Sequence, residues 1–156
     1  MKYFFVFLLF LSSCGFSPVS DLNKEEKEVF ISYDDTLLNN RFVSEIKRKQ
    51  AFLNLKLSNS KDAKINIEIL NHKILRYSGS RDRDFFSATG NIEYEISMKI
   101  SKLNKSKNFN FSSSQTFPYD INKILSNEEK TDEIEEMFFL GAQTQLINFL
   151  NLYFNE

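Results

Sequence analysis

The chain has 156 residues, a formal net charge of −1 at pH 7 and 42% hydrophobic residues. A nearly neutral chain produces no strong field for nucleic acid, so we expect no nucleic-acid partner. The length suits one domain, and a domain of this size can bury a core without disulfides or structural metals.

The first fourteen residues have the pattern of a bacterial lipoprotein signal. Lys2 supplies a basic start, and residues 3–11 form an uncharged apolar run. That run is much shorter than the ~20 residues of a membrane-spanning helix, which is typical of a secretion signal. Leu11-Ser12-Ser13-Cys14 resembles a lipobox, in which small residues precede a Cys that receives diacylglycerol and becomes the first residue after cleavage. We therefore predict a signal peptide over residues 1–13 and lipidation of Cys14; the alternative is an ordinary signal peptide or core helix with an incidental Cys.

The cysteine count agrees with a lipid anchor. Cys14 is the only Cys in the sequence, which excludes an internal disulfide, and a thioether would remove an exposed reactive thiol. Gly15 follows it in place of the Asp that retains many lipoproteins in the inner membrane, and this favours the outer membrane. Residues 15–27 are mostly polar and aperiodic. We predict a lipidated tether over residues 14–27 and a single domain over 28–156.

Four segments alternate apolar and polar side chains with the period of a β-strand. They cover residues 28–33, 64–78, 92–101 and 109–118. In the second segment the apolar residues lie at odd positions up to Ile69 and at even positions from Leu70, which predicts a β-bulge. The third alternates strictly, with Glu93, Glu95 and Lys99 on the polar side, and this favours an antiparallel sheet with one buried face. Turns are expected over residues 79–85 and 104–107.

Two segments have helical periodicity. Apolar residues recur every four positions from Leu38, which predicts a helix over residues 37–49. Ser126-Asn127-Glu128-Glu129 is typical of a capping box and predicts a second helix from Ser126, with its acids near the positive end of the helix dipole. The predicted apolar stripe of that helix is Ile134, Phe138, Gly141, Gln145, Phe149 and Tyr153.

The resulting element order is β-α-β-β-β-α. We predict an α+β fold in which both helices pack on one face of a four-stranded, mostly antiparallel sheet. Gly141 either lets the second helix approach the sheet closely or has no structural role.

No group of residues points to catalysis or to a metal site. His72, the single His, lies in a predicted strand, and one His is insufficient for most metal sites, so we predict a structural role. The acidic run from Glu128 to Glu136 lacks the spacing of an oxygen-ligand loop and is more typical of a solvated helix face than of a cation site. We expect no enzymatic activity, no metal and no cofactor beyond the covalent lipid on Cys14.

Three motifs resemble the LptE family of lipopolysaccharide-assembly lipoproteins. They are Cys14-Gly15-Phe16-x-Pro18, Thr116-Phe117-Pro118-Tyr119-Asp120 followed by Ser126 and the acidic run into Met137, and Ala142-x-x-Gln145-Leu146 followed by Phe149 and Leu150. The resemblance covers nearly the whole chain after Cys14. It implies an LptE-like domain over residues 28–156, anchored in the inner leaflet of the outer membrane on its periplasmic side. It also implies that the protein plugs and helps to assemble an LptD-like β-barrel, binds lipopolysaccharide and catalyses nothing.

A basic cluster is the candidate lipopolysaccharide site. Lys73, Arg76, Arg81 and Arg83 surround the predicted hairpin turn, and arginine binds phosphate through two charge-assisted hydrogen bonds. Interleaved acids at Asp82 and Asp84 leave a plain solvated turn as the alternative. Two other functions stay open: a periplasm-facing accessory of a lipid-transport ABC system or of barrel assembly, and a solitary surface antigen.

Overall fold

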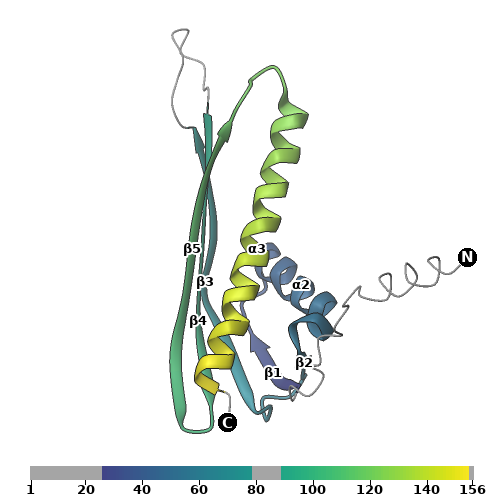
Figure 1. Cartoon of the computed structure of the whole chain (residues 1–156), viewed down its shortest axis with the longest axis vertical. Coiled ribbons are helices and arrows are strands. Elements are labelled where there is room, and N and C mark those ends of the chain that lie inside the picture. The colour runs from purple at the N-terminus through teal and green to yellow at the C-terminus, as the bar shows by residue number, and fades with distance from the viewer. Residues whose placement is uncertain (1–25, 79–88, 155–156) are drawn as a thin grey trace, which may run out of the picture.

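The computed structural model describes residues 26–78 and 89–154 (Figure 1). Its elements are β1 (Lys27–Ser32), α2 (Leu37–Leu53), β2 (Leu55–Leu57), β3 (Ile65–Ser78), β4 (Thr89–Lys102), β5 (Lys105–Pro118) and α3 (Ile124–Phe154). The strands form one sheet in the order β2-β1-β3-β4-β5. The two helices contact each other and cover one face of this sheet. The predicted α+β class and the placement of both helices are therefore confirmed.

The prediction of four mostly antiparallel strands is wrong in two details. The sheet has a fifth strand, β2, which pairs in parallel with β1, and β1 is also parallel to β3. Only β3, β4 and β5 are antiparallel neighbours, so the sheet is mixed. The reason is α2, which carries the chain back to the starting end of β1, so that the strand after it runs in the same direction.

Helix α2 has well-defined ends. It begins at Leu37 as predicted, and the Thr36 side chain accepts a hydrogen bond from the Asn39 backbone N–H. It continues to Leu53 rather than ending near residue 49. Asn54 ends it in the left-handed conformation with φ 57°, which Asn tolerates better than most residues.

The second helix starts earlier than predicted. Because α3 begins at Ile124, Ser126 lies inside the helix and is not its N-cap, and no acid lies in the first turn. Asn127 instead holds the preceding loop, because its Nδ2 donates to the Asp120 carbonyl over 2.7 Å. The β4–β5 turn also differs from the prediction, since β5 starts at Lys105 and the loop consists of Leu103 and Asn104.

The predicted β-bulge is confirmed by a register shift in β3 between Ile69 and Asn71. Before the shift, Ile69 lies opposite Met98 of β4, whose side chain is buried under the helices. After it, His72 and Arg76 lie opposite the buried Ile96 and Ile92. Opposed residues share a face in an antiparallel pair, so the bulge brings His72 and Arg76 to the helix side.

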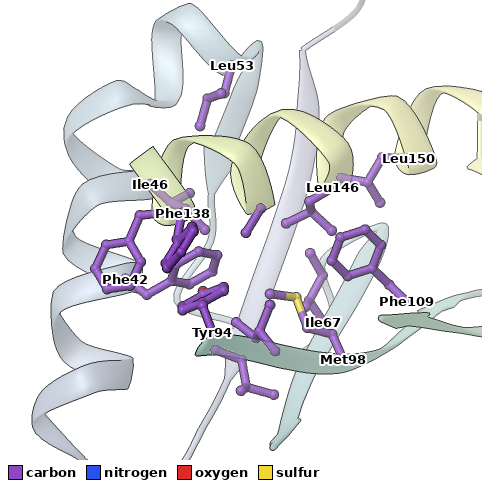
Figure 2. Close-up of a cluster of buried hydrophobic side chains, with 14 of the residues drawn as sticks. Phe42, Ile46, Leu53, Ile67, Tyr94, Met98, Phe109, Phe138, Leu146 and Leu150 are labelled. Carbon is purple, nitrogen blue, oxygen red and sulfur yellow. The ribbon is translucent and has the colours of Figure 1, made fainter. Parts of the chain in front are cut away.

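A continuous apolar core fills the space between the helices and the sheet (Figure 2). Alternate residues of β4 from Ile92 to Ile100 form its floor, and Phe42 and Ile46 of α2 close one side. The buried side chains of α3 include Ile134, Phe138, Ala142, Leu146 and Leu150. The predicted stripe was wrong at two positions, because Gln145 and Tyr153 are exposed. No helix among the described residues is long and apolar enough to cross a membrane.

Gly141 marks a close approach between α3 and β5. A Cβ atom at this position would lie 3.1 Å from Cζ of Phe111, which is tighter than an ordinary contact. Of the two roles considered for Gly141, the structure therefore favours the close approach.

Gln143 is a buried polar residue that packing does not explain. Its side chain is fully buried, and neither Nε2 nor Oε1 has a hydrogen-bond partner in the described structure. An unpaired buried amide costs about 1–3 kcal/mol, and Met has nearly the same shape. We expect Gln143→Met to raise the free energy of unfolding by about 1–3 kcal/mol in urea titrations. The exposed Gln145→Met is the control and should stay within about 0.5 kcal/mol; a destabilised Gln143→Met would show that the amide has a partner in solution.

Candidate functional site

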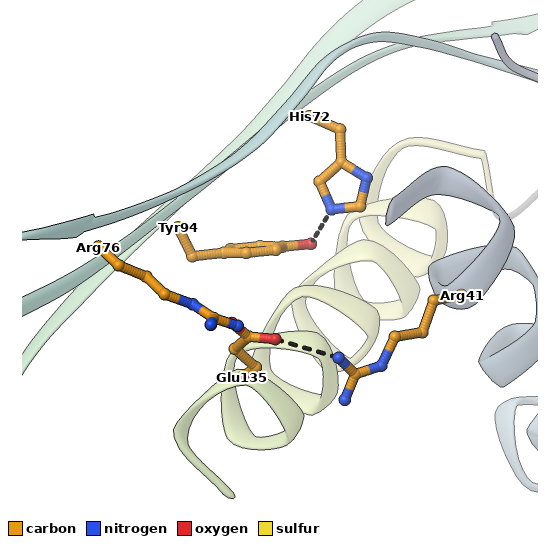
Figure 3. Close-up of polar contacts among 5 residues, drawn as sticks. All are labelled: Arg41, His72, Arg76, Tyr94 and Glu135. Atoms are coloured by element: carbon orange, nitrogen blue, oxygen red, sulfur yellow. Dashed lines mark hydrogen bonds and ion pairs between the residues drawn. The ribbon is translucent and has the colours of Figure 1, made fainter. Parts of the chain in front are cut away.

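A buried carboxylate joins the two helices to the sheet. The Glu135 side chain on α3 is only 4% exposed. Nη1 of Arg41 on α2 donates to its Oε2 over 3.0 Å, and Nε of Arg76 on β3 donates to its Oε1 over 3.0 Å (Figure 3). The Arg41 guanidinium also lies 5.1 Å from the ring centroid of Phe139. Both arginines remain partly exposed, so Glu135 fixes the positions of two cations at the surface.

Beside this triad, His72 lies in a neutral hydrogen-bonded chain. Asn39 Nδ2 donates to the Asp34 carbonyl over 2.9 Å, which leaves Oδ1 to face His72 Nδ1 at 2.8 Å. Nδ1 therefore carries the proton, and Nε2 accepts from the Tyr94 hydroxyl over 2.9 Å (Figure 3). Burial lowers the pKa of His72 from 6.5 to about 4 and raises the pKa of Tyr94. Both imidazole nitrogens are engaged, which agrees with the predicted structural role.

Next to Arg76 the sheet and the start of α3 line an open cavity of about 500 Å³. Ile92, Phe117 and Ile124 give it apolar walls, while Arg76 adds one positive charge and Glu128 and Asp132 add two negative charges to its lining. Phe117 packs directly over Gly90, where an added Cβ would come within 2.6 Å of Cζ. This combination of apolar surface with a guanidinium and two carboxylates is suited to an amphipathic ligand.

The opposite face of the sheet is polar, and no element within the described ranges covers it (Figure 1). On β4 this face carries Glu93, Glu95 and Lys99, as predicted. On β5 it carries small uncharged side chains: Asn108, Asn110, Ser112, Ser114 and Thr116. Leu75 and Tyr77 of β3 add apolar surface, each close to half exposed.

The residues of the predicted basic cluster do not all share a surface. Lys73 lies on the polar face, where Nζ is 2.9 Å from Oε2 of Glu95. Arg76 lies on the helix face, at the cavity and bound to Glu135. Arg81 and Arg83 lie outside the described residues, as does Cys14. The structure therefore separates Lys73 from Arg76.

Sequence patterns did not identify Arg41, Glu135 or the cavity. One signal was present, because Glu135 follows Ile134 and precedes Phe138 and Phe139, which places an acid within the apolar arc of a helix. The partners of that acid come from α2 and β3, 94 and 59 residues away in sequence, and no local pattern marks them.

No protein-family model matches the chain, and no curated protein matches it. Solved structures do share its fold. Rare lipoprotein B from Shewanella oneidensis aligns with a TM-score of 0.62 at 14% identity, over 83% of this chain and 100% of its own. A minor lipoprotein from Acinetobacter baumannii aligns with a TM-score of 0.60 at 10% identity, over 79% of this chain and 89% of its own. Lipoprotein B from Nitrosomonas europaea aligns with a TM-score of 0.60 at 12% identity, over 78% of this chain and 79% of its own. At 10–14% identity, these alignments show that the chain shares the fold of these lipoproteins.

Proposed function

We propose that this protein is an outer-membrane lipoprotein of the lipopolysaccharide transport machinery, lipidated at Cys14 and facing the periplasm. In this role it plugs and helps to assemble an LptD-like β-barrel, binds lipopolysaccharide and catalyses no reaction. One observation carries the proposal: the fold matches rare lipoprotein B over that protein's full length, in a chain whose N-terminus ends in a lipobox-like Leu11-Ser12-Ser13-Cys14.

The polar sheet face supports the role of a plug. The lumen of a membrane β-barrel is polar, and a domain held inside it meets hydrated side chains and not lipid. The Ser and Asn side chains of β5 offer donors and acceptors without fixed charge, which suits such a wet interface.

The cavity beside Arg76 supports lipopolysaccharide binding at the α3 end of the sheet. Its apolar walls fit acyl chains, and its arginine fits a phosphate. Arg81 and Arg83 follow β3 closely in sequence and complete the proposed basic site, whereas Lys73 lies on the other face and is left out of it.

Co-purification tests the partner. Tagged protein extracted from its native membrane in detergent should recover a large outer-membrane barrel in near-equal amount. Recovery of an inner-membrane permease would favour the lipid-transport ABC alternative, and recovery of no partner would favour a solitary lipoprotein. Cys14→Ala is the control for the anchor, because it should abolish acyl labelling and leave an uncleaved precursor.

Lipopolysaccharide binding should depend on Arg81 and Arg83. Hydrogen bonds to charged groups contribute about 1.5–3 kcal/mol each, and 1.4 kcal/mol corresponds to tenfold in affinity. We expect the Arg81→Ala, Arg83→Ala double variant to bind at least about tenfold more weakly in titrations with purified lipopolysaccharide. Lys73→Ala, on the opposite face, should bind as the wild type does. Equal affinity in a folded double variant would remove these arginines from the site.

A further inference from the structure

Strand β5 forms a long edge of the sheet. Within residues 26–78 and 89–154, β4 is its only strand neighbour. It runs the length of the molecule (Figure 1), and its 14 residues pair with β4 without a register shift. An edge strand presents main-chain N–H and C=O groups that have no partner in the sheet. Such groups can pair with a strand of another chain.

The β4–β5 hairpin determines which residues present these groups. Its loop has two residues, and Lys102 and Lys105 pair across it. In such a hairpin the flanking pair is hydrogen-bonded, and hydrogen-bonded pairs then alternate with non-hydrogen-bonded pairs along both strands. Odd-numbered residues of β5 therefore direct their main-chain groups toward β4, and even-numbered residues direct theirs outward. Pro118 agrees with this alternation, because a residue without an N–H fits an outward position.

The two edges of the sheet differ in their protection against other chains. Natural edge strands avoid unwanted pairing by being short or by carrying charges, Pro or β-bulges. The opposite edge, β2, has three residues with Lys56 at its centre. By contrast, residues 108–117 of β5 contain no charged side chain, no Pro and no bulge. A long edge without such protection promotes association, so it indicates a strand that pairs with it.

The surfaces on the two sides of this edge define the chemistry of the pairing strand. On one side lies the polar sheet face, with the exposed Ser112 and Ser114. On the other side, Phe111 of β5 is partly buried and lies close to Gly141 of α3. Met137, one helical turn before Gly141, is 46% exposed. Because side chains alternate along a strand, the pairing strand should alternate uncharged polar residues with apolar ones.

We propose that the outer edge of β5 binds an extended segment of the barrel partner by strand addition. Main-chain hydrogen bonds supply the affinity in this mode of binding. They would form at the outward residues Asn108, Asn110, Ser112, Ser114 and Thr116. The proposal rests on the barrel partnership proposed above and names a contact within it.

Continuity with the polar sheet face favours the barrel as the source of the strand. The outward residues of β5 are the same residues whose side chains form that face, which meets the barrel lumen in the proposed function. The edge would therefore lie in the lumen as well. The wall strands of a closed barrel have no free edge, so the segment would be a loop of the barrel chain that enters the lumen.

A proline substitution tests the pairing of the main chain. Ser112→Pro removes an outward N–H and leaves the β4 ladder intact, whereas Ser112→Ala, the control, changes only the side chain. Wild type and variant, as full chains with different tags, are expressed together at equal levels, and the barrel complex is purified in detergent. We expect at least about tenfold less Ser112→Pro than wild type in the complex, because a hydrogen bond is lost and the ring obstructs the incoming strand. Ser112→Ala should equal the wild type.

Hydrogen exchange measured by mass spectrometry tests the same pairing without a substitution. In the free wild type, about half of the amides of residues 106–117 should exchange quickly, because alternate N–H groups face outward. In the barrel complex these amides should be protected, while exchange in β2 stays unchanged. This measurement decides the question if Ser112→Pro does not fold, which its melting temperature as a free protein will show.

Three outcomes would contradict the proposals in different ways. Equal recovery of a folded Ser112→Pro, or unchanged exchange in β5, would overturn strand addition and leave the barrel partnership intact. Failure of the wild type to recover a barrel would overturn the proposed function itself. Protection of the β5 amides that rises with the concentration of the free protein would show that a second copy occupies the edge, and would overturn the assignment to the barrel.

Discussion

Removing both cations that bind Glu135, in the Arg41→Ala, Arg76→Ala double variant, should lower the free energy of unfolding by about 3–5 kcal/mol. The carboxylate is 4% exposed, and the described residues supply no salt-bridge partner to it besides these two arginines. Left alone, it would be a buried charge without compensation. Each single variant should cost less, about 1–2 kcal/mol, because the other arginine remains and because Arg41 and Arg76 are 39% and 58% exposed.

Urea unfolding of the wild type, both single variants and the double variant gives a double-mutant cycle. The double variant should lose more stability than the sum of the two single variants, because the Glu135 carboxylate is left without a cation only when both arginines are removed. Arg48→Ala is the control, because Arg48 is 70% exposed and pairs with Glu45 within the same helix, an interaction that contributes about 0.5 kcal/mol. A strictly additive cycle with a total below about 1 kcal/mol would mean that Glu135 is solvated in the folded protein.

The dependence of stability on the contact between Arg76 and Glu135 also limits how the lipopolysaccharide site can be tested. Arg76 borders the cavity and also stabilises the fold through Glu135. A loss of binding in Arg76→Ala could therefore come from either role. Substitutions of Arg81 and Arg83 therefore test binding more directly. The stability of the single Arg76 variant measures how much of its effect comes from the fold.

The features that could be predicted from sequence are those set by local periodicity. The alternation from Ile92 to Ile100 correctly placed one face of β4 against the core. The shift of the apolar residues from odd to even positions at Leu70 located the bulge. A strand that keeps its apolar side chains on the buried face can make this shift only through an extra residue. The recurrence of apolar residues every four positions from Leu38 correctly located α2, which begins at Leu37.

The features that were missed depend on contacts between distant segments. Three residues of β2 are too few for a periodic pattern, and their strand exists because α2 delivers them beside β1. Ser126 had the local pattern of an N-cap, but Asn127 binds Asp120 and the helix starts two residues before Ser126. The faces on which Lys73 and Arg76 lie depend on which alternate residues of β3 are buried after the bulge. A cluster of charges near one turn in the sequence was therefore divided between two faces.

Acid should weaken the fold through His72. The pKa of this His is about 4 in the folded protein against 6.5 in an unfolded chain, because burial disfavours the imidazolium. Between these values the unfolded state binds more protons, so stability is complete above pH 6.5 and falls as the pH drops toward 4. With allowance for the partial exposure of the ring, we expect a loss of about 1–2 kcal/mol between about pH 7 and pH 5.

The chain contains a single His, which makes the effect assignable. The imidazole signal in NMR spectra of the folded protein should stay neutral down to about pH 5, since Nδ1–H is held by Asn39 and Nε2 by the Tyr94 hydroxyl. The His72→Phe variant keeps a ring of similar size and cannot titrate. It should be less stable at pH 7, because Asn39 and Tyr94 lose their partner, yet its unfolding midpoint in urea should change less than that of the wild type between the two pH values. Equal pH dependence in the two proteins would mean that another group, and not the buried imidazole, controls the acid sensitivity of the helix–sheet contact.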